Sequence, residues 1–229
     1  MYRTMIKVCL ALAGLGLTAS ASAWAAERPE VPGPTASEAS EAKGKDEEER
    51  SAAAARVADW IAASGDNSAL PYIIVDKTAA SLLLFDADGK SLGQVPILIG
   101  VAVGDEATPG IGSKNLAEIG PAERTTPAGR FLAKFGMAAG RQKVLWVDYA
   151  TSVALHPIPK GNQKERRRQR ILSPGIEDNR ITFGCINLPV AFYSKSVRPL
   201  FQSKGGYVYI LPDTKPLEAV FPRLLARSY

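Results

Sequence analysis

The chain has 229 residues, of which 46% are hydrophobic, and it carries a formal net charge of +5 at a sequence pI of about 9.2. This length is enough for one well-buried domain with terminal extensions, and the hydrophobic fraction is ordinary for a globular protein. The sequence has one histidine and two cysteines, too few for a zinc site of these ligands, so we expect no metal and no cofactor.

The first 25 residues are typical of a secretory signal peptide. Arg3 and Lys7 form a short positive region, an apolar run covers 8–18, and small residues precede a cleavage site after Ala23 or Ala25. The apolar run is too short to cross a bilayer, which argues against an uncleaved transmembrane anchor. We therefore predict export to the periplasm or cell envelope, with a net charge of about +3 after the two cations are removed.

Cys185 is the cysteine that we expect in the mature protein, because Cys9 lies inside the predicted signal peptide. A protein with one cysteine has no internal disulfide, and an unpaired thiol outside the cytoplasm is exposed to oxidation. Its retention favours a chemical role, with a buried structural cysteine as the alternative.

Residues 26–50 are rich in acidic residues, alanine and proline and have almost no large apolar side chains, which predicts a flexible tether. A short helix is expected over 51–66, where Val57, Trp60 and Ile61 share one face. The main domain then extends from about 71 to 229.

The main domain has the pattern of a mainly β fold, a β-rich α+β domain. Apolar and β-branched runs bounded by turn residues predict strands over 72–76, 81–85, 94–100, 131–135, 144–149, 151–155 and 207–211. The first three form an antiparallel meander, and a long loop rich in glycine and proline follows over 100–121. Apolar residues at helical spacing predict a helix over 188–202, after Cys185.

Cys185 and His156, the one histidine of the sequence, are the minimum parts of a thiol-based acyl-transfer site. The imidazole takes the proton, and the thiolate attacks a carbonyl. No acidic residue is close to His156 in the sequence, so a backbone carbonyl is the better candidate for orienting the imidazole. The alternative is a structural histidine at the end of a strand.

The residues around the cysteine have further possible roles. Gly184 lets the backbone approach a substrate closely, and the amides of Gly184 and Cys185, near the start of the following helix, are suited to binding an oxyanion. Asn187 either bonds the substrate or orients the loop, or it caps the helix. Thr182 is either part of the site or a strand-end residue.

The segment Thr182-Phe183-Gly184-Cys185-Ile186-Asn187, with His156 upstream, resembles the motif of the L,D-transpeptidase catalytic domain of the YkuD type. Residues 75–85, 126–131 and 206–210 resemble the opening hairpin, the Thr-Pro-x-Gly-x-Phe element and the closing strand of this family. The resemblance covers about 71–212. It implies an L,D-transpeptidase-like β-sandwich in which Cys185 is the nucleophile, His156 is the base and the Pro157 carbonyl orients the imidazole.

The resemblance also implies substrates and partners, namely peptidoglycan stem peptides as donor and acceptor. Cys185 would form an acyl-enzyme at the third residue of a tetrapeptide stem and pass it to an amine, giving 3–3 cross-links or attaching a wall protein. A carboxypeptidase or endopeptidase of the same fold, and a non-catalytic peptidoglycan-binding module, are the alternatives. An exported basic domain is a poor candidate for binding nucleic acid. The oligomeric state does not follow from the sequence.

Two departures from the family pattern stand out. Phe183 replaces a second histidine of the motif, in the set expected to bind substrate and oxyanion with Gly184, Asn187 and Thr182. The spacer before Cys185 is also longer than the pattern allows, and we expect its excess, within 157–180, to form a lid over the cleft. The basic side chains of the spacer either contact stem-peptide carboxylates or form a solvated helix face; the predicted lid contacts are Arg166, Arg167 and Arg170.

Overall fold

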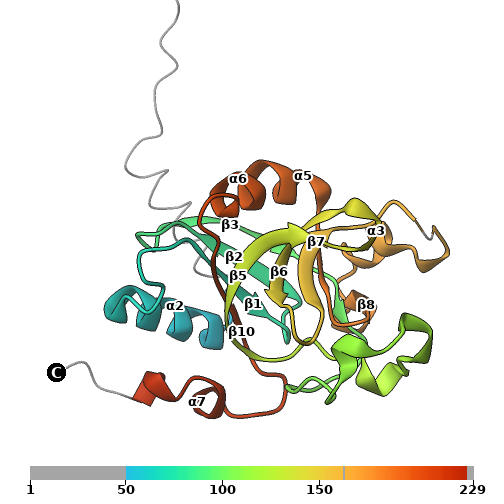
Figure 1. Cartoon of the computed structure of the whole chain (residues 1–229). Coiled ribbons are helices and arrows are strands. Elements are labelled where there is room, and N and C mark those ends of the chain that lie inside the picture. Colours follow the sequence, from blue (N-terminus) through green and yellow to red (C-terminus); the bar gives the residue numbers. More distant parts are fainter. Residues whose placement is uncertain (1–49, 162, 226–229) are drawn as a thin grey trace, which may run out of the picture.

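The computed structural model describes residues 50–161 and 163–225 (Figure 1). The predicted signal peptide and nearly all of the predicted tether lie outside the described residues. Within the described ranges, no helix has both the length and the apolar character needed to cross a membrane.

Eight strands form one sheet in the order β3-β2-β1-β10-β5-β6-β7-β9. Their bounds are β1 Tyr72–Asp76, β2 Ser81–Phe85, β3 Ser91–Pro96, β5 Gly129–Met137, β6 Lys143–Asp148, β7 Val153–Pro157, β9 Ile186–Leu188 and β10 Gly206–Ile210. Strands β1, β2 and β3 pair antiparallel, so the predicted meander is confirmed. A second, parallel pair consists of β4 (Ile99–Gly100) and β8 (Arg180–Thr182).

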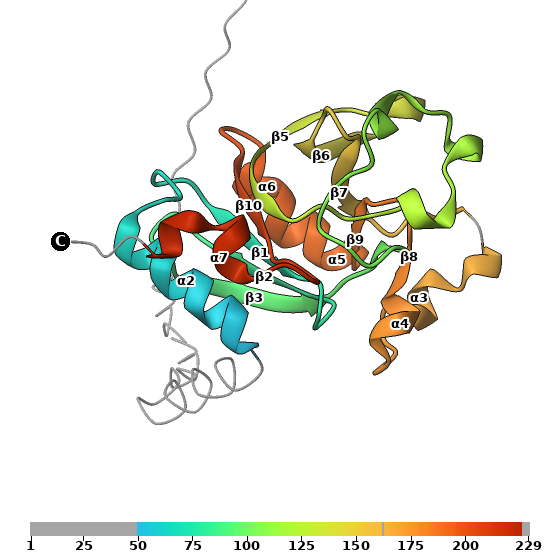
Figure 2. The same cartoon turned by 90° about the horizontal axis from the view of Figure 1, so that it is seen from below.

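The long strand β5 joins the two halves of the sheet. Its residues up to Ala133 pair with β10, whereas its residues from Lys134 onward pair with β6. The sheet bends along this strand, so that β6, β7 and β9 turn away from β1 and β2 (Figure 2). The prediction of a mainly β fold is confirmed.

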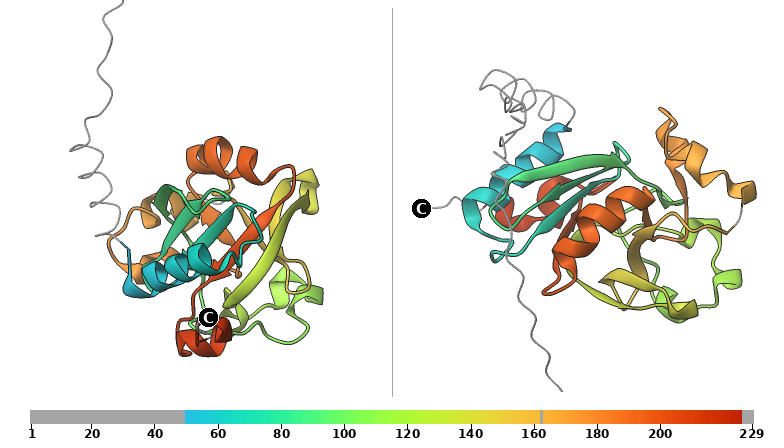
Figure 3. Two further views of the ribbon diagram at one scale, coloured as in Figure 1. Left: turned by 90° about the vertical axis from the view of Figure 1, so that its left-hand side faces the viewer. Right: turned by 90° about the horizontal axis from the view of Figure 1, so that it is seen from above.

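Helices cover both faces of the first half of the sheet (Figures 1 and 3). One face carries α5 (Val190–Phe192), the π-helical segment η6 (Tyr193–Val197) and α6 (Arg198–Phe201), so the predicted helix after Cys185 is confirmed. The other face carries α2 (Ala52–Ser64) and, near it, α7 (Leu217–Val220).

Strand β1 shows the consequence of this double cover. Ile73 and Val75 pack into the apolar cluster under α5 and α6, while Tyr72 and Ile74 pack into the cluster under α2. Every position of β1 is therefore buried, which explains its continuous apolar sequence.

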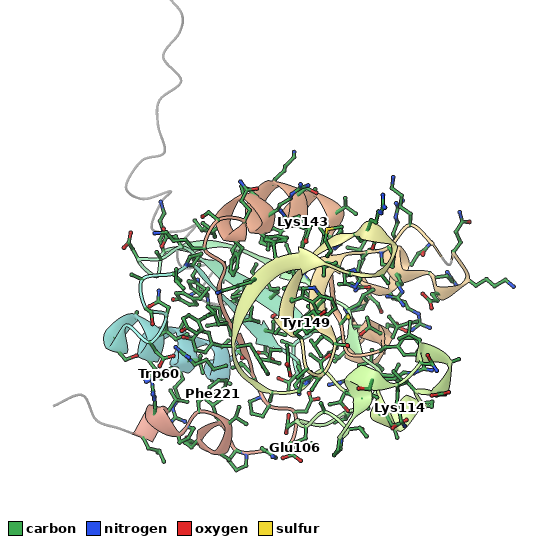
Figure 4. The ribbon with its side chains drawn as sticks, viewed as in Figure 1. Trp60, Glu106, Lys114, Lys143, Tyr149 and Phe221 are labelled. Carbon is green, nitrogen blue, oxygen red and sulfur yellow. The ribbon has the colours of Figure 1, made fainter. Side chains whose placement is uncertain are left out.

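Helix α2 corresponds to the predicted helix over 51–66. Ser51 caps its start by accepting a hydrogen bond from the Ala54 amide at 3.1 Å, and Gly65 ends it with a left-handed φ of 65°. The helix belongs to the domain, because Trp60 contacts Phe221 with ring centroids 6.5 Å apart (Figure 4). Phe221 directly precedes the terminal turn η7 (Pro222–Leu225).

Three elements differ from the sequence prediction. The expected strand over 94–100 is two strands, β3 and β4, in different sheets. Residues 186–188, expected to lead into the helix, form β9 and pair with β7. The long loop over 100–121 contains two short 3-10 turns, η1 (Ile111–Ser113) and η2 (Leu116–Glu118). A third, η3 (Pro121–Glu123), begins at its end.

The insertion between β7 and β8 contains the turn η5 (Gln163–Glu165) and the short helices α3 (Arg167–Arg170) and α4 (Ile176–Asn179). Ile158 and Ile171 are buried against Leu98, which attaches the insertion to the segment before β4. The insertion is thus anchored at the end of the molecule that carries β8 (Figure 2).

Candidate active site

The Cys185 side chain lies in the turn between β8 and β9, one residue before β9. The parallel pairing of β7 with β9 places His156 directly beside Asn187. Cys185 directly precedes Ile186, which pairs with Leu155, the residue before His156. The thiol sulfur is 3.6 Å from the Ser152 carbonyl oxygen, to which it donates. The fold therefore places Cys185 directly before β9, the strand that pairs with the His156 strand β7.

The His156 ring makes a contact at each nitrogen. Nδ1 is 2.9 Å from the carbonyl oxygen of Pro157, and Nε2 is 3.2 Å from the side-chain nitrogen of Asn187. An amide nitrogen only donates, so Nε2 accepts and the proton lies on Nδ1, where it is donated to Pro157. In this tautomer the lone pair of Nε2 is the basic site.

The thiol and the imidazole do not hydrogen-bond each other in the described part of the chain. The Asn187 amide occupies Nε2, and the thiol is directed to Ser152. Proton transfer from Cys185 to His156 therefore requires the amide to give up its place at Nε2 to the thiol, and catalytic hydrogen bonds commonly form only once the substrate is bound.

The turn before Cys185 is held by two threonines. Thr182 Oγ1 accepts from the Gly184 amide at 3.1 Å and donates to the Cys185 carbonyl at 2.6 Å. Thr126 Oγ1 donates to the Gly184 carbonyl at 2.9 Å, from the neighbouring loop. Thr182 is thus a strand-end residue that also fixes the conformation of the turn.

The oxyanion role predicted for the amides of Gly184 and Cys185 stays a prediction. The Gly184 amide is already bound by Thr182, so it is not a free donor in this conformation. The helix begins only at Val190, beyond β9, so no helix N-terminus points at the turn. The intervening strand β9, with three residues, is too short to be recognised by its sequence pattern.

Replacing Gly184 with alanine is expected to destabilise the protein by about 1 to 3 kcal/mol. Its φ is +121°, and an added Cβ would lie 2.6 Å from the Thr125 carbonyl oxygen. Gly120→Ala is the matched control, since its φ is −68° and its nearest contact is an ordinary 3.7 Å. Urea unfolding of both variants checks this, and equal midpoints would contradict it.

Asn187 is fully buried and links His156 to the insertion. Its Oδ1 accepts from the Arg167 guanidinium at 2.6 Å, which fixes the amide so that its nitrogen faces the imidazole. The alternative role as a helix cap is not realised, because Pro189 occupies the cap position without a side-chain hydrogen bond.

Of the three predicted lid arginines, Arg167 is the one that reaches the site, and it also binds Glu165 at 2.6 Å. Arg170 donates to the Glu165 carbonyl and to Asp178 within the insertion. Arg166 is exposed, and its backbone has a left-handed φ of 49°, so it separates η5 from α3.

Phe183 contacts the loop that precedes β5. The guanidinium carbon of Arg124 lies 3.9 Å from the ring centroid, a cation–π contact, and the same guanidinium donates to the Ile119 carbonyl. The ring that stands in place of a histidine therefore connects the Cys185 turn to the long loop.

Burial governs the protonation of both reactive groups. It lowers the pKa of His156 below the ordinary 6.5, the positive Arg167 acts in the same direction, and the hydrogen bond to Pro157 opposes them. Burial also raises the pKa of the Cys185 thiol above the ordinary 9.0, against the weaker opposing effects of the Ala154 amide and Arg167. The resting pair is therefore a neutral thiol and a neutral imidazole.

Alkylation of Cys185 by iodoacetamide is expected to accelerate with a midpoint above pH 9.0. Only the thiolate reacts, and the raised pKa keeps it scarce at neutral pH. A thiolate–imidazolium pair would instead give a fast plateau between about pH 5 and 8. Rates measured by mass spectrometry across this range check the prediction, and such a plateau would contradict it.

Neither a protein-family model nor a curated protein matches the sequence. The solved structures similar to the chain include L,D-transpeptidases. One from Xylanimonas cellulosilytica has 16% identity and a TM-score of 0.36, covering 62% of this chain and 60% of that chain. The catalytic domain of the L,D-transpeptidase from Enterococcus faecium has 20% identity and a TM-score of 0.32, covering 62% of this chain and 96% of that chain.

Another similar structure is the helical cell shape determining protein Pgp2 from Campylobacter jejuni. It has 16% identity and a TM-score of 0.42, covering 69% of this chain and 56% of that chain. The chain spans 60%, 58% and 49% of the lengths of the first three solved structures that it matches.

Proposed function

We propose that the protein is an exported cysteine acyltransferase that acts on peptidoglycan stem peptides, an L,D-transpeptidase. The observation that carries the proposal is the placement of Cys185 directly before β9, which pairs with the His156 strand β7, with the Pro157 carbonyl at Nδ1 of the imidazole. This tautomer supplies a base at Nε2 for a thiol. The sequence motif around Cys185 and the predicted signal peptide support the substrate and the location.

In the proposed reaction, Cys185 attacks the carbonyl between the third and fourth residues of a tetrapeptide stem. His156 Nε2 takes the thiol proton and returns it to the departing amine, so the fourth residue leaves and a thioester remains. An amine of a second stem then attacks the thioester and gives up a proton to His156, and the thiol is released. The product is a 3–3 cross-link, or an attached wall protein if the amine belongs to one.

Mass analysis of tetrapeptide muropeptides incubated with the protein tests this proposal. Loss of the terminal residue with formation of a cross-linked dimer, absent with Cys185→Ala, is the expected result. Loss without a dimer would replace the transpeptidase with a carboxypeptidase or endopeptidase of the same fold. Unchanged muropeptides that nevertheless bind to the protein would identify a non-catalytic wall-binding module.

A further inference from the structure

We propose that the insertion after β7 holds a binding site for a free carboxylate of the stem peptide, an inference that rests on the proposed function. The insertion forms an open pocket of about 300 Å³, lined by residues of 158–161 and 163–169. Four of its lining side chains are cationic and none is acidic. The residues that matter here are Ile158, Lys160, Gln163, Arg166, Arg167 and Arg168.

Most of this positive charge is not neutralised by the protein. Lys160, Arg166 and Arg168 are exposed, and within the described ranges their side chains make no hydrogen bond or ion pair. Arg167 is the one paired member, through Glu165. Cations held this closely repel one another, and a bound anion removes that repulsion.

The backbone around the pocket is constrained rather than loose. Arg166 adopts a left-handed φ of 49°, which costs energy for a residue with a side chain. Ile158 at the start of the pocket and Ile171 just beyond it are buried against Leu98. The backbone that carries the cationic side chains is thus anchored to the rest of the fold at both ends of the pocket segment.

Arg167 connects this pocket to the reacting groups. It lines the pocket and also donates to Asn187, whose amide faces Nε2 of His156. A carboxylate bound by Arg167 in the pocket is therefore separated by one side chain, that of Asn187, from Nε2 of His156. Guanidinium groups bind carboxylates through paired, charge-assisted hydrogen bonds.

Two carboxylates of the proposed reaction have this chemistry. One belongs to the residue that leaves the donor, and the other belongs to the diamino acid that supplies the acceptor amine. The pocket is formed by the lengthened spacer between His156 and Cys185 and not by the residues of the cysteine motif. In this proposal it is an additional site that recognises a carboxylate of the substrate.

Calorimetric titration of the Cys185→Ala protein separates the two sources. The donor tetrapeptide is supplied with a C-terminal acid or a carboxamide, and the acceptor stem with a free or an amidated diamino acid carboxylate. We expect amidation of one of them to weaken binding roughly tenfold or more. The Arg166→Gln/Arg168→Gln double variant is expected to lose this preference, whereas Arg198→Gln, an exposed arginine on α6, keeps it.

Retention of the acid preference in the double variant, or the absence of any preference in the parent, would overturn the pocket assignment. Both outcomes are independent of whether the unmodified protein releases the terminal residue from muropeptides. Failure of that release, with the acid preference intact, would overturn the proposed reaction instead.

Discussion

Replacing Cys185 with serine is expected to lower the turnover of a tetrapeptide donor by at least about a thousandfold. A hydroxyl is far less acidic than a thiol, and burial has lowered the pKa of His156, which makes it a weak base for so poor an acid. The fold is expected to persist, because the side chain is half-buried and serine retains a donor for the Ser152 carbonyl.

Steady-state turnover of the donor and thermal unfolding of the same preparation check this result together. A serine variant that keeps more than about a tenth of the turnover would place the nucleophile elsewhere. A large fall in the melting temperature would instead mean that the thiol has a structural role. The Asn187→Asp variant tests the contact at His156. It replaces the amide nitrogen by a carboxylate oxygen, which accepts a hydrogen bond from Nε2 and cannot donate one to it.

The sequence singled out Cys185, His156 and Pro157 more readily than the residues around them, because these three lie in short local patterns. In the structure the Pro157 carbonyl contacts the His156 ring, and Cys185 directly precedes the strand that pairs with the His156 strand; their catalytic roles stay predictions. The contacts of Asn187 with His156 and of Arg167 with Asn187 cross 31 and 20 positions of the chain. No local pattern carries such contacts, because they depend on how β7, β9 and the insertion meet.

The same limit applies to the fold. Strands β1 and β2 are recognisable because buried strands have continuous apolar runs. Strand β9 has three residues and β8 has three, and each is defined by a partner distant in the sequence. Thr126 belonged to a recognised element, but its hydrogen bond to the Gly184 carbonyl became visible only in three dimensions.

A buried ion-pair network next to this site was also invisible to the sequence. Lys77 follows β1 and has no exposed surface, and its ammonium donates to Asp105 at 2.9 Å and to the Thr126 carbonyl at 3.0 Å. Asp213 lies 3.4 Å from the same ammonium and also pairs with Arg180. The network joins the turn after β1 to the loop that holds the Cys185 turn.

Replacing Lys77 with alanine is expected to destabilise the protein by about 3 to 5 kcal/mol, because it leaves a buried carboxylate without its cation. The Lys77→Ala/Asp105→Asn double variant removes both charges and is expected to cost less than the sum of the two single changes, Lys77→Ala and Asp105→Asn. Urea unfolding of the four proteins measures the coupling. Additive losses would mean that the two charges do not interact.

The same network predicts how stability responds to acid. Burial opposes ionisation of Asp105, but hydrogen bonds from Thr214, Asp213 and Lys77 outweigh it and hold the pKa well below the ordinary 3.8. A carboxyl with a lowered folded pKa stabilises the protein above 3.8 and loses that contribution as the pH falls further. Without Lys77 the pKa of Asp105 rises toward 3.8, so Lys77→Ala loses less stability on acidification than the parent. The gap in unfolding free energy between the two proteins is therefore expected to narrow as the pH falls from about 6 to 2. Urea unfolding across this range checks this, and a constant gap would show that Lys77 does not hold the Asp105 charge.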